Sequence, residues 1–195
     1  MREAITFQEF LRLRRQWPVD CFFEPEELLF SEEALAHDQD NLPTPAEWEM
    51  IKRFGTKVAR PVRLIWNAPL IITSGFRDEE VNRLAGGEET SDHRFQIGGA
   101  CDLRPLDPSD AAVRALFHAI AENTLDKNAD PSFDQLILYP FSPQGRARVH
   151  IGWRPTGNRK ELRRAVRVKK PDGTFEWSWP LVDWEEWKKD LRLET

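Results

Sequence analysis

The chain has 195 residues, of which 40% are hydrophobic and 31% are charged, and its net charge at neutral pH is −5. A chain of this length fits one domain with its own hydrophobic core, and no apolar run approaches the ~20 residues that a membrane-spanning helix needs. The acidic balance creates no field that would attract a polyanion, so nucleic acid is excluded as an expected partner.

The start of the chain, MREAITFQEFLRLRRQWPVD, contains neither a continuous apolar stretch nor a cleavage site of small residues. This composition predicts a protein synthesised in the cytoplasm without a secretory signal peptide. The two cysteines, Cys21 and Cys101, lie far apart in the sequence and cannot define a disulfide framework by themselves. Reduced thiols are therefore expected.

Short amphipathic pieces fill residues 1–40, and the stretch FFEPEELLFSEEAL among them predicts one or two short helices. We expect this region to pack as a lead-in against the main domain. A capping box, TPAE, begins at Thr44 and places proline at the first helical position. The helix that follows is predicted to reach about Trp66, with a kink or a restart at Pro61.

The central segments combine short strands with a short helix. PLIIT, over 69–73, has the apolar and β-branched composition of a buried strand. Residues 78–84 predict a turn or two of helix that ends at the glycine pair 86–87. In the stretch 100–104 the side chains alternate, so that Asp102 points away from the apolar side.

A helix and a hairpin are predicted next. Residues 107–110 (DPSD) repeat the cap-and-proline signal, and the apolar residues at helical spacing after them predict a core-facing helix over 108–123. Two apolar stretches, 134–139 and 147–154, are joined by the turn-rich PFSPQGR and predict a hairpin. Alternation in the second strand places His150 on its polar face.

The last part of the chain is rich in tryptophan. Residues 163–170 and TFEWSW, separated by a Pro-Asp-Gly turn, predict a second hairpin, and Asp183 is predicted to cap a final helix. We expect an α+β fold, a small antiparallel sheet flanked by helices. The predicted organisation is a lead-in over 1–40, a main domain over 41–161 and a Trp-rich hairpin-helix extension over 162–195.

Two of the four histidines lie where a metal could use them. His93 stands in a polar loop and His150 on a polar strand face, so that with Asp102 they form a His/Asp/His set. Three protein ligands and one open position is the arrangement of a catalytic zinc. Isolated residues of these types are more often surface or hydrogen-bonded core side chains, so both interpretations stay open here. Neither His37 nor His118 is predicted to be a ligand.

A series of motifs in chain order carries a resemblance to a known family. The motifs are NLP (41–43), PVR (61–63), ITSGFR (72–77), VN (81–82), GG (86–87), SDH (91–93), GGACD (98–102), DQLI (134–137) and VHI (149–151). From about residue 23 to residue 159 the chain resembles the zinc D-Ala-D-Ala carboxypeptidase superfamily, in particular its compact members related to the L,D- and D,D-peptidases of bacteria and their phages. The resemblance implies a fold of the Hedgehog/DD-peptidase type.

The resemblance also implies a set of site residues. In the family the pattern SxHxxGxAxD supplies two zinc ligands and a later strand histidine supplies the third, which implies zinc bound by His93, Asp102 and His150. Arg77 of the SGxR motif and Ser91 of the SxH motif are implied to bind substrate. The chain departs from the pattern after His93, where the loop RFQI is two residues longer.

The proton carrier is a second departure. Many relatives place an acid or a histidine two or three residues before the last zinc ligand, where this chain has Arg148 and Ala147, and others place a glutamate where this chain has Tyr139. A hydrolytic zinc site needs a group that moves a proton. Asp134 and Tyr139 are the candidates by position, but they alternate onto opposite strand faces. Arg148 shares the face of His150 and is a candidate to stabilise an oxyanion.

Two functions follow from these observations. The resemblance implies a zinc metallopeptidase that hydrolyses a bond next to a D-amino acid in the peptides of peptidoglycan, reached by release from the cell or by delivery on a particle. The alternative is a non-catalytic, zinc-stabilised structural or attachment protein of the same fold, for example in a phage virion. Its Trp-rich tail would then contact other virion proteins, although packing against the domain explains the same tryptophans.

Overall fold

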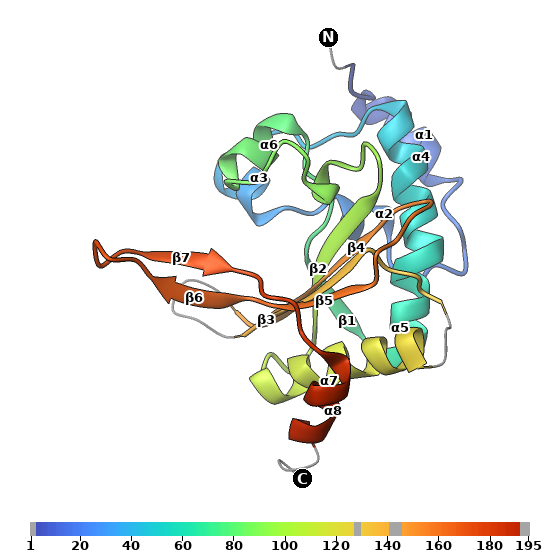
Figure 1. Cartoon of the computed structure of the whole chain (residues 1–195). Helices are drawn as coiled ribbons and strands as arrows, with labels where there is room; N and C mark the ends of the chain where they lie inside the picture. The colour runs from blue at the N-terminus through green and yellow to red at the C-terminus, as the bar shows by residue number, and fades with distance from the viewer. Residues whose placement is uncertain (1–2, 127–129, 141–145, 192–195) are drawn as a thin grey trace.

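Figure 1 shows the computed structural model of the chain, which describes residues 3–126, 130–140 and 146–191. At its centre lies a five-stranded sheet in the order β1-β2-β4-β3-β5. The strands are β1 (Leu70–Ser74), β2 (Gly99–Pro105), β3 (Gln135–Tyr139), β4 (Arg148–Trp153) and β5 (Glu161–Arg164). Neighbouring strands are antiparallel except β3 and β5, which pair in parallel. The fold is α+β, as the sequence predicts.

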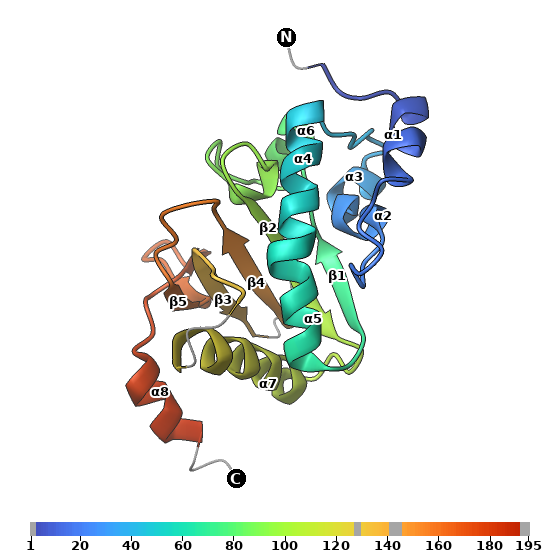
Figure 2. The ribbon, with the colours of Figure 1, turned by 90° about the vertical axis from the view of Figure 1, so that its right-hand side faces the viewer.

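The helices gather on one face of the sheet and at its ends. They are α1 (Phe7–Arg14), α2 (Pro25–Leu29), α3 (Glu32–Ala36), α4 (Pro45–Phe54), α5 (Arg60–Trp66), α6 (Glu79–Leu84), α7 (Asp110–Ala121) and α8 (Trp184–Leu191), with η1 (Gly55–Ala59), η2 (Asp92–Arg94) and η3 (Glu122–Asp126) as short helical segments. Figure 2 shows α4, α5 and α7 covering one sheet face. None of the helices in the described ranges has the length and apolar character that crossing a bilayer requires.

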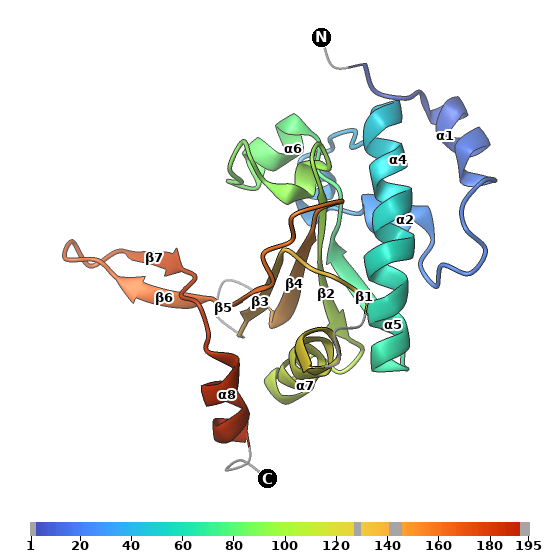
Figure 3. The ribbon, with the colours of Figure 1, turned by 45° about the vertical axis from the view of Figure 1, so that its right-hand side comes forward.

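The helix predicted from Thr44 to Trp66 is present and is interrupted as Pro61 requires. Thr44 and Glu47 form the predicted capping box. The segment η1, which has π-helical hydrogen bonding, stands between α4 and α5 and ends two residues before Pro61. Proline cannot donate a backbone hydrogen bond, and a π-helical turn widens the helix where that bond is missing. The chain therefore continues as one nearly straight column (Figure 3).

Alternation along β2 and β4 separates a core face from a polar face. Cys101 and Leu103 of β2 and Val149 and Ile151 of β4 are buried in the main hydrophobic cluster. The side chains between them, which include Asp102, point to the other face, as the sequence predicts. The sheet therefore presents a polar face opposite the helices α4, α5 and α7.

Helix α7 begins later than predicted. Two polar residues, Asp107 and Ser109, compete for the N-cap position, and the structure places Ser109 there, where its hydroxyl accepts from the Ala112 amide at 3.2 Å. Asp107 instead accepts from the Ser109 amide at 2.9 Å. The predicted start at residue 108 was therefore wrong by two residues.

Both ends of the chain pack on the central domain. Phe23 and Leu28 of the lead-in are part of the main core. At the other end, the Trp187 ring of α8 lies 4.6 Å from that of Phe117, centroid to centroid. The second predicted hairpin is present as β6 (Val166–Lys169) and β7 (Phe175–Ser178). The predicted boundary between residues 161 and 162 falls inside β5, so this sheet strand spans it.

Candidate metal centre

The polar face of the sheet is the floor of an open cleft of about 1540 Å³. Side chains of β2, β3 and β4 line this floor, among them Asp102, Tyr139 and His150. Residues of α2 and α3 and the loop after α6 line one side, and Trp177 and Trp179 line another. In Figure 1 the α3–α6 region and the β6–β7 hairpin stand on either side of this face.

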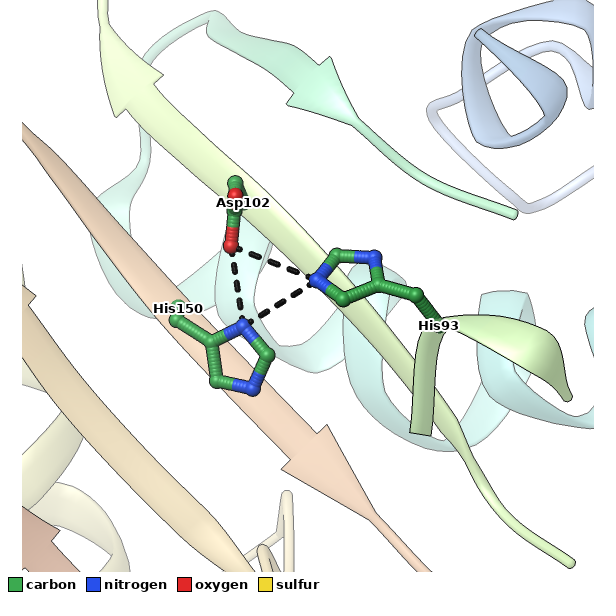
Figure 4. A group of neighbouring side chains, drawn as sticks. All are labelled: His93, Asp102 and His150. Atoms are coloured by element: carbon green, nitrogen blue, oxygen red, sulfur yellow. Dashed lines mark hydrogen bonds and ion pairs between the residues drawn. The ribbon is translucent and has the colours of Figure 1, made fainter. Parts of the chain in front are cut away.

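Three side chains converge in this cleft, as Figure 4 shows. Asp102 of β2 and His150 of β4 are direct cross-strand partners, and His93 enters from η2. Oδ1 of Asp102 lies 2.9 Å from Nδ1 of His150 and 3.6 Å from Nε2 of His93. The two imidazole nitrogens are 3.3 Å apart. Three residues that are distant in sequence thus bring one potential ligand atom each to the same place.

The other nitrogen of His93 is held by the backbone. Nδ1 of His93 lies 2.7 Å from the carbonyl oxygen of Gly75, and the Arg77 amide donates to the His93 carbonyl at 2.8 Å. Because a carbonyl oxygen only accepts, Nδ1 carries the proton and Nε2 presents its lone pair to the other two side chains. This is the outer hydrogen bond that orients metal-binding histidines. The SGxR segment therefore fixes the orientation of His93.

Burial and neighbouring groups shift the pKa values of His93 and Asp102. His93 is 5% exposed, and burial together with the charge of Arg77 lowers its pKa to about 4. Burial opposes ionisation of Asp102, but its interactions with His150, at 2.9 Å, and with His93 outweigh this and hold the Asp102 pKa well below its usual range. At neutral pH the cluster therefore offers a carboxylate and a neutral imidazole, which are the forms that bind metal.

The spacing of the three atoms fits a zinc ion. Zinc takes nitrogen and oxygen ligands at about 2.0–2.1 Å in tetrahedral geometry, which puts the ligand atoms about 3.3 Å from one another. The separations of 2.9, 3.3 and 3.6 Å lie on both sides of this value. His93, Asp102 and His150 can thus hold a metal ion, and a fourth position would face the cleft.

The longer loop after His93 does not displace the cluster. Phe95 adopts a left-handed backbone conformation with φ of 54° and buries its ring against Phe54 and Phe76, with centroids 5.4 and 6.1 Å away. Gln96 and Ile97, which follow, are exposed. The two additional residues therefore extend outward, while Phe95 anchors the loop and β2 still delivers Asp102 to the site.

The predicted substrate-binding residues both line the cleft. Arg77 donates through Nε to the Ser74 hydroxyl at 3.1 Å, and burial lowers the pKa of its guanidinium. Ser91 stands directly before η2 and caps it without a hydrogen bond from its side chain. Both residues thus line the same cleft as the cluster.

Arg148, as strand alternation predicts, shares the polar sheet face with His150, and Tyr139 lies on the same face. Arg148 and Tyr139 are cross-strand partners, and the Arg148 guanidinium carbon lies 4.1 Å from the centroid of the Tyr139 ring. Arg148 also donates through Nε to Oδ2 of Asp102 at 3.2 Å. Burial, with the charge of Asp102, raises the pKa of Tyr139. A cation and a neutral phenol therefore stand beside the cluster.

Asp134, the other candidate proton carrier, has a different environment. Its side chain is fully buried, and Arg159 donates to it through Nε at 3.0 Å and through its backbone amide at 3.1 Å. Arg154 forms a further ion pair with it at 3.6 Å. Burial raises its pKa, but the bonds from Arg159 outweigh this and leave the pKa below its usual value. Asp134 therefore joins the start of β3 to the segment before β5 rather than facing the cluster.

Three cleft residues were not predicted as site residues. Asp92 lies next to His93 in sequence, and a Cβ added at Gly152 would be 3.4 Å from its Oδ2 and 3.5 Å from Nε2 of His150. Its position within the SDH motif was a signal that sequence reasoning did not use. Trp177 and Trp179 reach the cleft from the tail. No local pattern places them there, because the contact depends on how the hairpin is oriented.

The chain was compared with known proteins in three ways. A family model described as Peptidase M15 matches residues 22–126, more than half of the chain. The matched part contains Arg77, Ser91, His93 and Asp102, and it ends before the strands β3 and β4. Neither the curated proteins nor the solved structures gave a match.

Proposed function

The chain belongs to the peptidase M15 family, and from this membership and the geometry of the cleft we propose that it is a zinc-dependent hydrolase of peptidoglycan peptides, cleaving a bond next to a D-amino acid. The observation that carries the proposal is the convergence of His93, Asp102 and His150 at separations that suit zinc. The proposal assigns these three residues as its ligands.

The shape of the cleft supports a peptide as substrate. Its volume of about 1540 Å³ exceeds the roughly 300–1,000 Å³ of a small-molecule site, and it is open rather than enclosed. An extended peptide fits such a space. The guanidinium groups of Arg77 and Arg148 on its floor are suited to carbonyl and carboxylate oxygens.

The proposal gives a separate role to each cleft residue beside the three ligands. A bound zinc ion would supply a Lewis acid and an activated water. Arg77 orients the substrate by hydrogen bonds to a carbonyl or carboxylate oxygen, with Ser91 beside it. Arg148 stabilises the negative charge that develops on the scissile carbonyl oxygen. Tyr139, a neutral phenol, is the candidate that gives its own proton to the leaving amine and regains one from the attacking water, as the C–N bond breaks and the C–O bond forms.

The experiment that tests the proposal uses purified full-length protein loaded with zinc. The protein is incubated with peptidoglycan stem peptides that contain L,D- and D,D-bonds, and the products are identified by mass spectrometry. We expect cleavage next to a D-residue, lost in His150→Ala and kept in His37→Ala, a histidine on the surface at the end of α3. No cleavage by protein with bound zinc would contradict the proposal.

One observation favours a second candidate function. The side chain that stands two residues before His150 and contacts Asp102 is an arginine rather than an acid, so the proton carrier would have to be a phenol, which is a weak acid. In that case the protein would be a zinc-stabilised structural or attachment piece, for example of a phage virion, with the tail as its contact surface. Zinc binding and heat stabilisation without cleavage is the result that would favour this candidate.

A further inference from the structure

The C-terminal hairpin lies beyond the part of the chain that the family model matches, yet it reaches the cleft. After β5 the chain leaves the sheet and forms β6 and β7, which project from the sheet edge (Figure 1). Trp177, on β7, and Trp179, just after it, line the same cleft as the His/Asp/His cluster. Arg163 of β5 holds this segment by donating to the Trp179 carbonyl at 2.7 Å.

Both indole rings contact Tyr139. Nε1 of Trp179 donates to the Tyr139 hydroxyl oxygen at 2.9 Å. The Trp177 ring packs edge-on against the phenol, with centroids 6.0 Å apart and planes at 69°. An indole N–H is a donor only, so the Tyr139 oxygen is the acceptor in this bond. The phenol proton is then left for a different acceptor.

The contacts form a continuous path from the hairpin to the cluster. Trp179 binds Tyr139, the Arg148 guanidinium lies over the Tyr139 ring at 4.1 Å, and Arg148 donates to Asp102 at 3.2 Å. Tyr139 itself lines the cleft. Within the described ranges, these contacts leave the cleft side of Tyr139 for its proton, and a substrate oxygen would lie there.

We propose that the β6–β7 hairpin forms a wall of the substrate cleft and that Trp179 is a positioning residue, which holds the Tyr139 hydroxyl so that it donates a hydrogen bond to an oxygen of the bound peptide. This inference rests on the proposed function for the identity of the ligand. It gives the Trp-rich tail a role in the site itself, instead of a role in contacting other proteins.

A spectroscopic test is available because Tyr139 is the single tyrosine of the chain. Full-length protein labelled with fluorotyrosine gives one fluorine NMR resonance, which reports on this hydroxyl. The variant Trp179→Phe keeps an aromatic ring and removes the N–H donor. The matched control is Phe175→Leu on the same hairpin, where the ring contacts Arg167 rather than Tyr139.

The expected results concern the protein before any turnover. Trp179→Phe shifts the resonance and Phe175→Leu leaves it in place, with both variants retaining zinc and the wild-type melting temperature. Addition of a stem pentapeptide ending in D-Ala-D-Ala shifts the wild-type resonance again. The inference would be overturned if the chemical shift of the fluorotyrosine changed neither in Trp179→Phe nor on addition of the peptide. It would also be overturned if the peptide shifted the resonance equally in wild type and in Trp179→Phe.

Kinetics separate this inference from the proposed function. If the protein cleaves peptides, Trp179→Phe lowers kcat about three- to tenfold, the equivalent of one neutral hydrogen bond, with KM little changed. Cleavage by Trp179→Phe at the wild-type rate would overturn the inference and leave the proposed function standing. If the peptide shifts the fluorotyrosine resonance of the wild type but is not cleaved, the result would contradict the proposed function and support the inference that the hairpin forms a wall of the cleft.

Discussion

Arg148 donates a hydrogen bond through Nε to Oδ2 of Asp102 at 3.2 Å, so a cation holds the second oxygen of the carboxylate whose first oxygen faces the two histidines. The guanidinium carbon of Arg148 also lies 4.1 Å from the centroid of the Tyr139 ring. Arg148 is thereby held between Asp102 and Tyr139 in the cleft. The strand position two residues before His150 thus holds a positioned positive charge.

Replacement of Arg148 by glutamine is expected to affect catalysis more than metal binding. The variant loses the charge next to the scissile carbonyl, and one such donor typically contributes about a hundredfold to kcat. We expect kcat/KM to fall by about that factor, with the zinc content unchanged. Arg12→Gln, on α1, is the control. A variant with wild-type kcat/KM would show that Arg148 does not act in the reaction.

The metal ligands are tested by elemental analysis. His93→Ala and His150→Ala each remove one of three ligand atoms. Loss of an outer hydrogen-bond partner alone costs about 10- to 100-fold in affinity, so we expect these variants to lose more than about 100-fold. Zinc is expected near one ion per chain in wild type and in His37→Ala. An equal zinc content in wild type and His150→Ala would show that His150 is not a ligand of the bound metal.

Removal of the metal is expected to lower the melting temperature. A ligand that binds only the folded state at 100 times its Kd stabilises by about 2.7 kcal/mol, and each kcal/mol moves Tm by about 2–4 °C in a chain of this size. A chelator should therefore lower Tm by about 5–10 °C in wild type. His150→Ala should show no such change, and an equal change in both would point to a different metal site.

Gly75→Ala is expected to destabilise the protein and to disturb His93. A Cβ at this position would lie 2.0 Å from the carbonyl oxygen of Leu28, which is backbone and accepts from the Phe76 amide at 2.7 Å. Forced overpacking of this kind costs about 1–3 kcal/mol. Because the Gly75 carbonyl also binds Nδ1 of His93, zinc affinity should fall as well. Urea unfolding and zinc titration measure both effects.

Asp134 predicts a pH dependence of stability. Arg159 holds the Asp134 pKa below its usual value, so the ion pair stabilises the folded state above pH ~3.9, where the unfolded chain ionises. That stabilisation is lost as the pH falls through the lower folded-state pKa. Asp134→Asn should therefore be less stable than wild type at pH 7, and the difference should shrink in acid. A difference that is the same from neutral to acidic pH would show that the charge is not responsible.

The local elements were predictable because each depends on neighbours in sequence. The capping box at Thr44, the helix interruption before Pro61 and the helical stripe of α7 follow from hydrogen bonding and periodicity over a few residues. The same holds for the faces of Asp102 and His150, since a period of two decides which side of a strand a residue occupies. The start of α7 was predicted too early because Asp107 and Ser109 are both good N-cap residues, and the sequence pattern does not distinguish between them.

The sequence by itself thus determined the chemistry of the cluster and the strand faces that carry Asp102 and His150. Only the tertiary structure decided that His93 meets them, that β5 joins the sheet in parallel, and that Asp134 binds Arg159 instead of facing the site. It also decided that Trp179 binds Tyr139 across 40 positions of sequence. Contacts between residues so far apart in sequence depend on how strands and loops pack over the core. The periodicity within one segment carries no information about that packing.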